Sequence, residues 1–140
     1  MKLYHTSPQK IKEIKSTGTF GESLCFSTSV YQITSSDTVF VYSIELDEED
    51  VIDVFSFDED DAPEVIQHIS NVLDCDVSLA LAYLRDKASP EDPELSWFIQ
   101  GQMGSAAKEA GYKAARGVDE QGTVYIVPLL GREQELKLEN

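Results

Sequence analysis

The sequence lacks basic residues throughout its middle, where no Lys or Arg occurs between Lys15 and Arg85 although this stretch holds 15 acidic residues. The rest of the chain has 11 acidic and 11 basic residues, so the net charge of −15 arises in the middle. Acidic residues are densest over 45–64. Such a field opposes non-specific nucleic-acid binding and favours encounter with a basic surface. A solvated face that keeps the protein soluble is the alternative interpretation.

Cysteine, histidine and long apolar runs are also scarce. The only thiols are Cys25 and Cys75, the only imidazoles are His5 and His68, and no CxxC motif occurs, which excludes a disulfide framework and argues against a metal site. No apolar run reaches the roughly 18–20 residues of a membrane span, and the first ten residues lack the apolar stretch of a secretory signal. We expect a protein that binds no membrane and stays in the cytoplasm.

The common nucleotide and hydrolase motifs are missing as well. The chain contains no GxxxxGK[ST], GxGxxG, GxSxG or HExxH, the signatures of phosphate loops, dinucleotide-binding folds, serine hydrolases and zinc peptidases. At 140 residues, with 41% hydrophobic and 26% charged residues, the chain suits one globular domain over 1–140.

Hydrophobic periodicity predicts strands first, then helices, then strands again. Apolar residues at helical spacing predict a helix over 62–73, Asp76 is placed to cap a second helix to about residue 85, and Gly111 to end a third that begins near 89–93. Two glycines inside the third helix, Gly101 and Gly104, predict a close approach to another backbone or a ligand on a face distinct from its apolar stripe. Strands are predicted over 2–5, 24–26, 38–46, 113–118 and 123–127. This order predicts an α+β fold with a mainly antiparallel sheet.

Three polar clusters interrupt predicted strand ends: Tyr4-His5-Thr6-Ser7, Phe26-Ser27-Thr28-Ser29 and Asp119-Glu120-Gln121-Gly122. Each by itself is typical of a turn or a helix cap, and Thr6 or Ser7 could cap a short helix that starts at Pro8. Together, a histidine on the first strand, hydroxyls after an aromatic strand and a carboxylate at a late strand end resemble the ADP-ribosyltransferase superfamily.

The ends of the chain carry a longer resemblance. LYHTSPQKIKEIKSTGTFGESL near the start and SWFIQGQMGSAAKEAGYKAARGVDEQGTVYIV in the last third are similar to anti-CRISPR ADP-ribosyltransferases that act on type I-F surveillance complexes. The resemblance covers about the first 25 and the last 45 residues and leaves out the acidic middle.

This resemblance implies an ADP-ribosyltransferase-like, split β-sheet with helices inserted between early and late strands. It implies NAD as co-substrate and no metal. Asp119 matches the acid on which those enzymes depend, and Glu120 is the position that the wider superfamily favours, so the assignment between these neighbours stays open. The candidate NAD-site residues are His5, Thr6, Ser7, Phe20, Phe26, Ser27, Tyr31, Trp97 and Gln100. Among them, the aromatics at 20, 26 and 31 are candidates for stacking on nicotinamide, and Trp97 and Gln100 could face the target.

The reaction implied by this resemblance explains why a carboxylate is expected near the bound sugar. Cleavage of the nicotinamide–ribose bond builds positive charge on the sugar, as in glycoside cleavage, and a fixed carboxylate near the ring stabilises that charge. The implied target is a protein with a basic nucleic-acid-binding surface, such as a DNA-recognising subunit of a CRISPR surveillance complex, with no direct contact between enzyme and nucleic acid. Two alternatives remain: a non-catalytic acidic DNA mimic, and a transferase with another recipient in the host cell. The sequence assigns no oligomeric state.

Overall fold

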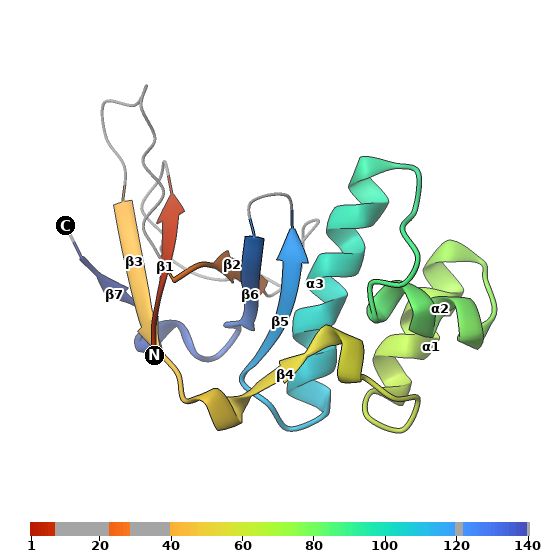
Figure 1. Ribbon diagram of the computed structural model, residues 1–140, viewed down its shortest axis with the longest axis horizontal. Coiled ribbons are helices and arrows are strands. Elements are labelled where there is room, and N and C mark those ends of the chain that lie inside the picture. Colours follow the sequence, from red (N-terminus) through yellow and green to blue (C-terminus); the bar gives the residue numbers. More distant parts are fainter. Residues whose placement is uncertain (8–22, 29–39, 120–121, 140) are drawn as a thin grey trace.

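The computed structural model describes residues 1–7, 23–28, 40–119 and 122–139 (Figure 1). Its elements follow the predicted order of strands, helices and strands, so the α+β class is confirmed. The strands are β1 (Lys2–Ser7), β2 (Ser23–Phe26), β3 (Phe40–Glu45), β4 (Val51–Asp53), β5 (Ala114–Asp119), β6 (Gly122–Pro128) and β7 (Lys137–Leu138). The helices are α1 (Pro63–Leu73), α2 (Val77–Leu84) and α3 (Pro93–Glu109), with short 3-10 turns at Glu48–Asp50, Val54–Ser56 and Glu133–Glu135.

The strands form two sheets that meet at one point. Sheet A has the order β1-β3-β7 and is antiparallel, and sheet B has the order β2-β6-β5-β4, in which only the β4–β5 pair is parallel. A single-residue bridge joins them: the Tyr4 N–H donates to the Ser27 carbonyl (2.7 Å) and the Ser27 N–H donates to the Tyr4 carbonyl (2.9 Å). Figure 1 shows β2 between β1 of sheet A and β6 of sheet B, with the helices beyond the far side of sheet B.

Sheet B therefore has two differently covered faces. Its helix side carries Ala115 and Ile126, which pack with Ile66, Ile99 and Met103 of the helices into one core cluster. The side of sheet B that faces sheet A buries a second cluster, to which both sheets contribute. Its buried members are Leu3, Phe26, Ile44, Leu46, Ala114, Tyr125, Val127 and Leu129. Alternation along β5 and β6 explains the split, because successive strand residues point to opposite faces.

Acidic side chains cap the N-termini of α1, α2 and α3. Asp76 accepts the N–H of Leu79 at the start of α2 (2.8 Å), and Asp92 accepts the N–H of Glu94 at the start of α3 (2.9 Å). Glu109, at the far end of α3, accepts the N–H groups of Glu64 and Val65 and so caps α1, both at 3.0 Å. These bonds satisfy amides that have no partner within their own helix.

Gly104 fixes the contact between α3 and β2. A Cβ at this position would lie 2.2 Å from Ser23 Oγ and 3.0 Å from Ile126 Cγ2, so only glycine lets the helix approach this closely. The close approach predicted from the two glycines is thus present at Gly104. The prediction that they lie apart from the apolar stripe is wrong, because Gly101 and Gly104 are both buried within the packed face of α3.

Other predictions were wrong in local detail. The predicted strand over 2–5 extends to Ser7, because Thr6 and Ser7 pair with Val41 and Phe40 of β3. The helix predicted from Pro8 lies outside the described residues. Val72, one of the apolar residues whose helical spacing predicts a buried stripe over 62–73, is instead 48% exposed, one residue before the end of α1. No helix of the described chain is both long and apolar enough to cross a membrane.

Candidate functional site

His5 lies on β1 where the two sheets meet, and its ring is oriented from both sides. Its Nδ1 is 2.8 Å from the Cys25 carbonyl oxygen, which can only accept, so Nδ1 carries the proton and Nε2 of the neutral ring is an acceptor. The Phe26 ring packs against it with centroids 5.5 Å apart, tilted by 47°. Burial lowers the pKa of His5, against a smaller opposing effect of the bond to Cys25. The site therefore presents a neutral, fixed imidazole.

Thr6, the residue after His5 on β1, has a side-chain hydroxyl without a hydrogen-bond partner in the described structure. Its Oγ1 atom is buried. Ser27, 6% exposed, is held beside β1 by its two backbone hydrogen bonds to Tyr4. Because successive strand residues point to opposite faces, the Thr6 hydroxyl lies on the other face of β1 from the His5 ring. Buried polar atoms are normally paired, so each face of β1 here carries a polar atom available to a ligand, the His5 Nε2 on one and the Thr6 Oγ1 on the other. The acceptor Nε2 of the oriented His5 ring is compatible with a ligand that carries hydroxyl groups, such as a ribose.

The β5–β6 hairpin places the backbone of Asp119 in sheet B, the sheet that also contains β2. Asp119 is the last residue of β5, and its backbone pairs with Gly122, which has the left-handed φ of 115° that a tight hairpin requires. On β6, Gly122 is three residues from Tyr125, the partner of Phe26. That separation is about 10 Å along the strand, and two strand spacings of about 4.8 Å separate β2 from β5. Glu120 and the side chain of Asp119 lie outside the described part of the structure.

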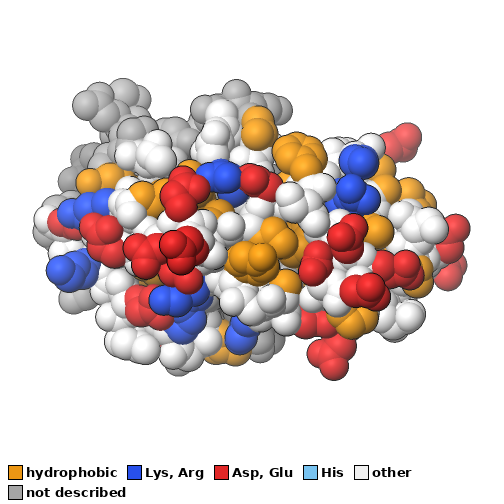
Figure 2. Space-filling view, turned by 60° about the horizontal axis from the view of Figure 1, so that its bottom comes forward, with side chains coloured by type: hydrophobic (Ala, Val, Ile, Leu, Met, Phe, Trp, Pro, Cys, Tyr) orange, Lys and Arg blue, Asp and Glu red, His pale blue; other side chains and the backbone are white. Residues whose placement is uncertain are grey.

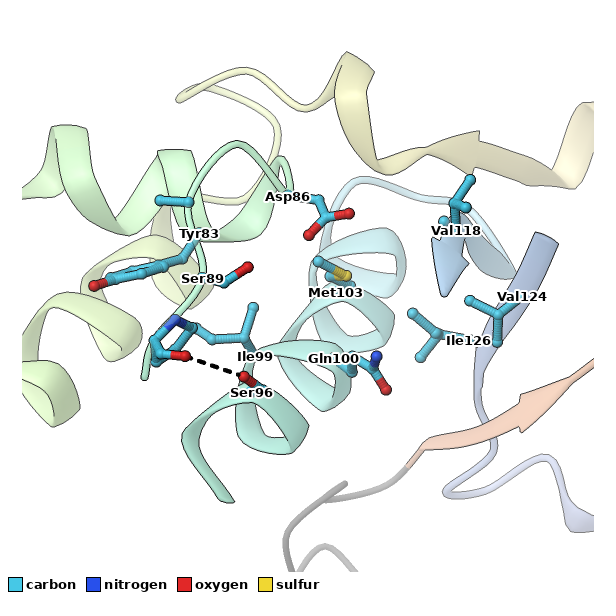
Figure 3. Close-up of a pocket in the computed structure, with 13 residues that line it drawn as sticks. Tyr83, Asp86, Ser89, Ser96, Ile99, Gln100, Met103, Val118, Val124 and Ile126 are labelled. Atoms are coloured by element: carbon cyan, nitrogen blue, oxygen red, sulfur yellow. Dashed lines mark hydrogen bonds between the residues drawn. The ribbon is translucent and has the colours of Figure 1, made fainter. Parts of the chain in front are cut away.

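A cavity of about 220 Å³ lies on the helix side of the same hairpin (Figure 3). It is enclosed by the segment between α2 and α3, by α3 itself, and by β5 and β6. Gln100 contributes to its lining, as do Gly117 and Val118, which directly precede Asp119 on β5. His5 does not line this cavity, so the structure does not bring Gln100 and His5 into one pocket.

The acidic middle is partly neutralised at the edge of sheet B. Arg116 on β5 makes a two-pronged ion pair with Asp53 on β4, Nε–Oδ1 at 2.7 Å and Nη2–Oδ2 at 3.1 Å, and contacts Glu48 at 3.3 Å. Hydrogen bonding to Arg116 lowers the pKa of Asp53. Lys113 lies 3.9 Å from Asp50. Figure 2 shows acidic side chains in several groups on this face, with Lys and Arg side chains among them.

The remaining candidates are dispersed. Phe26 is only 2% exposed and belongs to the sheet A side core, and Trp97 is 51% exposed on α3. Phe20 and Tyr31 lie outside the described residues, as does the side chain of Ser7. Within the described ranges, no group of three or more His, Cys, Asp and Glu side chains could hold a metal ion.

Asp86 is the residue that sequence reasoning missed. It lines the cavity near Gln100, in a segment that the sequence marks only as a break between helices. Its left-handed φ of 57° is unusual for a residue other than glycine, although Asp and Asn adopt it more readily than most. No sequence signal distinguishes it from the chain's other surface acids.

No protein-family model and no curated protein matches this sequence. A comparison with solved structures finds a crystal structure of an anti-CRISPR protein at a TM-score of 0.59, with 23% sequence identity, covering 91% of this chain and 88% of that chain. At this identity the likeness establishes a shared fold.

Proposed function

We propose that this chain is an anti-CRISPR ADP-ribosyltransferase. It would transfer ADP-ribose from NAD to a protein target with a basic nucleic-acid-binding surface, such as a DNA-recognising subunit of a type I-F CRISPR surveillance complex. The observation that supports the proposal is the oriented neutral imidazole of His5, on the strand that the Tyr4–Ser27 bridge joins to the sheet of the β5–β6 hairpin. The shared fold with an anti-CRISPR protein supports the inhibitory role.

The residues divide the chemistry as follows. The Nε2 atom of His5 accepts a hydrogen bond from a ribose hydroxyl of the dinucleotide. Asp119 or Glu120 places a negative charge where the ribose becomes positive during cleavage. The reaction breaks the bond from C1′ to the nicotinamide nitrogen, forms a bond from C1′ to a nucleophilic target atom, and releases nicotinamide and one proton.

Modification would inhibit the target by charge and bulk. ADP-ribose brings two negative phosphates to a surface that binds nucleic-acid phosphates, and each lost phosphate contact weakens binding. The acidic middle, apart from the carboxylates paired with Arg116 and Lys113, favours encounter with such a basic surface.

Intact-mass spectrometry of the purified type I-F surveillance complex tests the proposal. With NAD and a substoichiometric amount of this protein, we expect one subunit to gain the mass of ADP-ribose and the complex to lose DNA binding. Inhibition that needs no NAD, requires one copy per complex and weakens with salt would instead identify an acidic DNA mimic. An adduct on a different host protein would retain the transferase and change the recipient.

A further inference from the structure

The cavity on the helix side of sheet B is too small for a dinucleotide. Its volume is about 220 Å³, below the about 300–1,000 Å³ typical of pockets that enclose a whole small-molecule ligand. It is separated from His5 by sheet B, since Ile126 faces the cavity and Phe26 faces His5. Its size suits one long side chain.

The described residues that line the cavity are mostly apolar or uncharged and include one carboxylate. Ile99, Met103 and Val124 provide apolar surface, and Gln100 and Ser89 provide polar groups. Among the described residues that line the cavity, Asp86 is the one that carries a charge. Figure 3 shows its carboxylate above Met103, between the segment that carries Ser89 and the strands that carry Val118 and Val124.

The Asp86 carboxylate has no partner in the described chain. No hydrogen bond or ion pair of its side chain is present there, whereas Asp53, Glu109 and Glu135 are each satisfied by basic groups or backbone amides. An unpaired carboxylate next to apolar side chains suits a basic side chain, because the aliphatic stem of Lys or Arg can lie on the apolar surface while its charged end reaches the carboxylate.

We infer that this cavity binds a lysine or arginine side chain of the protein target, with its stem on Met103 and its charged end at Asp86. The inference rests on the proposed function and names the target chemistry next to the modified residue. Burial raises the pKa of Asp86, consistent with a carboxylate that lacks a cation. A pyrophosphate would be repelled here, so the dinucleotide and the target approach the hairpin from different faces of sheet B.

The position of the cavity links its occupant to the chemistry. Gly117 and Val118 line it, and the next residue of β5 is Asp119. A basic side chain held there would fix the target backbone beside the hairpin and orient the neighbouring nucleophile. Holding reactants in register contributes to rate without any new chemical group.

Methyl NMR of the full-length protein tests the inference directly. The chain has two methionines: Met103 lines the cavity, and Met1 lies at the chain terminus where its amine donates to Leu46. We would titrate methyl-labelled protein with Nα-acetyl-lysine methylamide, Nα-acetyl-arginine methylamide, the uncharged norleucine analogue, and NAD. We expect either cationic probe to shift the Met103 signal saturably, with Met1 unmoved and norleucine much weaker.

Asp86→Asn is the diagnostic variant and Asp74→Asn its matched control. Both positions are exposed aspartates with a left-handed φ (57° and 51°), so asparagine preserves the backbone at each. Asp86→Asn should weaken binding of the cationic probes about three- to fivefold, the range of one partly exposed ion pair, and Asp74→Asn should not.

The outcomes are separable from those of the proposed function. If norleucine binds as well as lysine, if Asp86→Asn binds unchanged, or if NAD is the ligand that shifts Met103, the inference is overturned even when ADP-ribose transfer is observed. A cation-specific, Asp86-dependent shift supports the cavity's chemistry even when the mass experiment identifies a different recipient.

Discussion

The two faces of sheet B offer opposite electrostatic environments on either side of one hairpin. On the sheet A side, the neutral ring of His5 is held by the Cys25 carbonyl and packs on Phe26, and within the described residues no carboxylate is bonded to it. On the helix side, the unpaired carboxylate of Asp86 stands over an apolar floor. The first environment tolerates an anionic ligand rich in hydroxyls, and the second attracts a cation. The difference teaches how a strongly acidic protein could admit both NAD and a basic target.

The largest effect on activity should come from substitutions of the candidate acids Asp119 and Glu120 of the β5–β6 hairpin, where the ends of β5 and β6 pair. Asp119→Asn or Glu120→Gln should reduce NAD-dependent nicotinamide release by about 10²–10³-fold at whichever position carries the charge, because one preorganised electrostatic contact is lost. A coupled nicotinamide assay measures it, and thermal denaturation checks that the variants fold. Full activity in both single variants would contradict the role of this hairpin.

An intermediate effect should come from the helix side alone. Gly104→Ala places a Cβ 2.2 Å from Ser23 Oγ, so α3 must move away from β2, and we expect a loss of about 1–3 kcal/mol in unfolding free energy. Urea denaturation measures the loss. Gly117→Ala is the control, because its Cβ would meet Val54 at an ordinary 3.7 Å. Equal stability of the Gly104→Ala variant and the wild type would show that the helix contact is looser than the structure has it.

The smallest effect should come from the sheet A side and should depend on pH. Because the pKa of His5 is lowered from 6.5, the neutral ring contributes stability above about pH 6.5, and this contribution is lost progressively as the pH falls below that value. His5→Asn keeps a donor near Nδ1 and removes the Nε2 acceptor. We expect a three- to tenfold decrease in nicotinamide release, the value of about one hydrogen bond.

The same variant should also flatten the pH dependence of stability below about pH 6.5. His68→Asn serves as the control, since His68 is exposed on α1, where its ring and that of Phe98 form a T-shaped pair with centroids 5.7 Å apart. Denaturation midpoints at several pH values measure the difference. An unchanged slope in His5→Asn would mean that His5 titrates as in the unfolded chain.

Local signals predicted the helices well. The cap at Asp76 and the stop at Gly111, whose φ is 92°, act within one helical turn, so sequence alone locates them. Strand β4 escaped prediction because it is three residues long, lies among acids, and gains its hydrogen bonds from β5 more than 60 residues away. The two-residue β7, which pairs with Tyr42 and Ser43, escaped for the same reason.

The candidate site divides in a similar way. The clusters at His5 and Ser27 were expected to act together, and the structure joins their strands through the Tyr4–Ser27 bridge, while their roles in binding stay predictions. The importance of Asp86 could not be inferred, because its distinction is the cavity that α3 and the distant hairpin build around it. Patterns identify residue types at strand ends, but an unpaired charge is recognised only when its surroundings are known.

The carboxylate caps of the helices have a consequence for how this surface can evolve. At Leu79, Glu94, Glu64 and Val65 the donors are main-chain amides, which every residue other than proline supplies whatever its side chain. The helix starts are therefore independent of lysine and arginine anywhere in the chain. A lineage under pressure to alter the charge it presents to a changing partner could gain or lose basic residues freely without loosening these three helix ends.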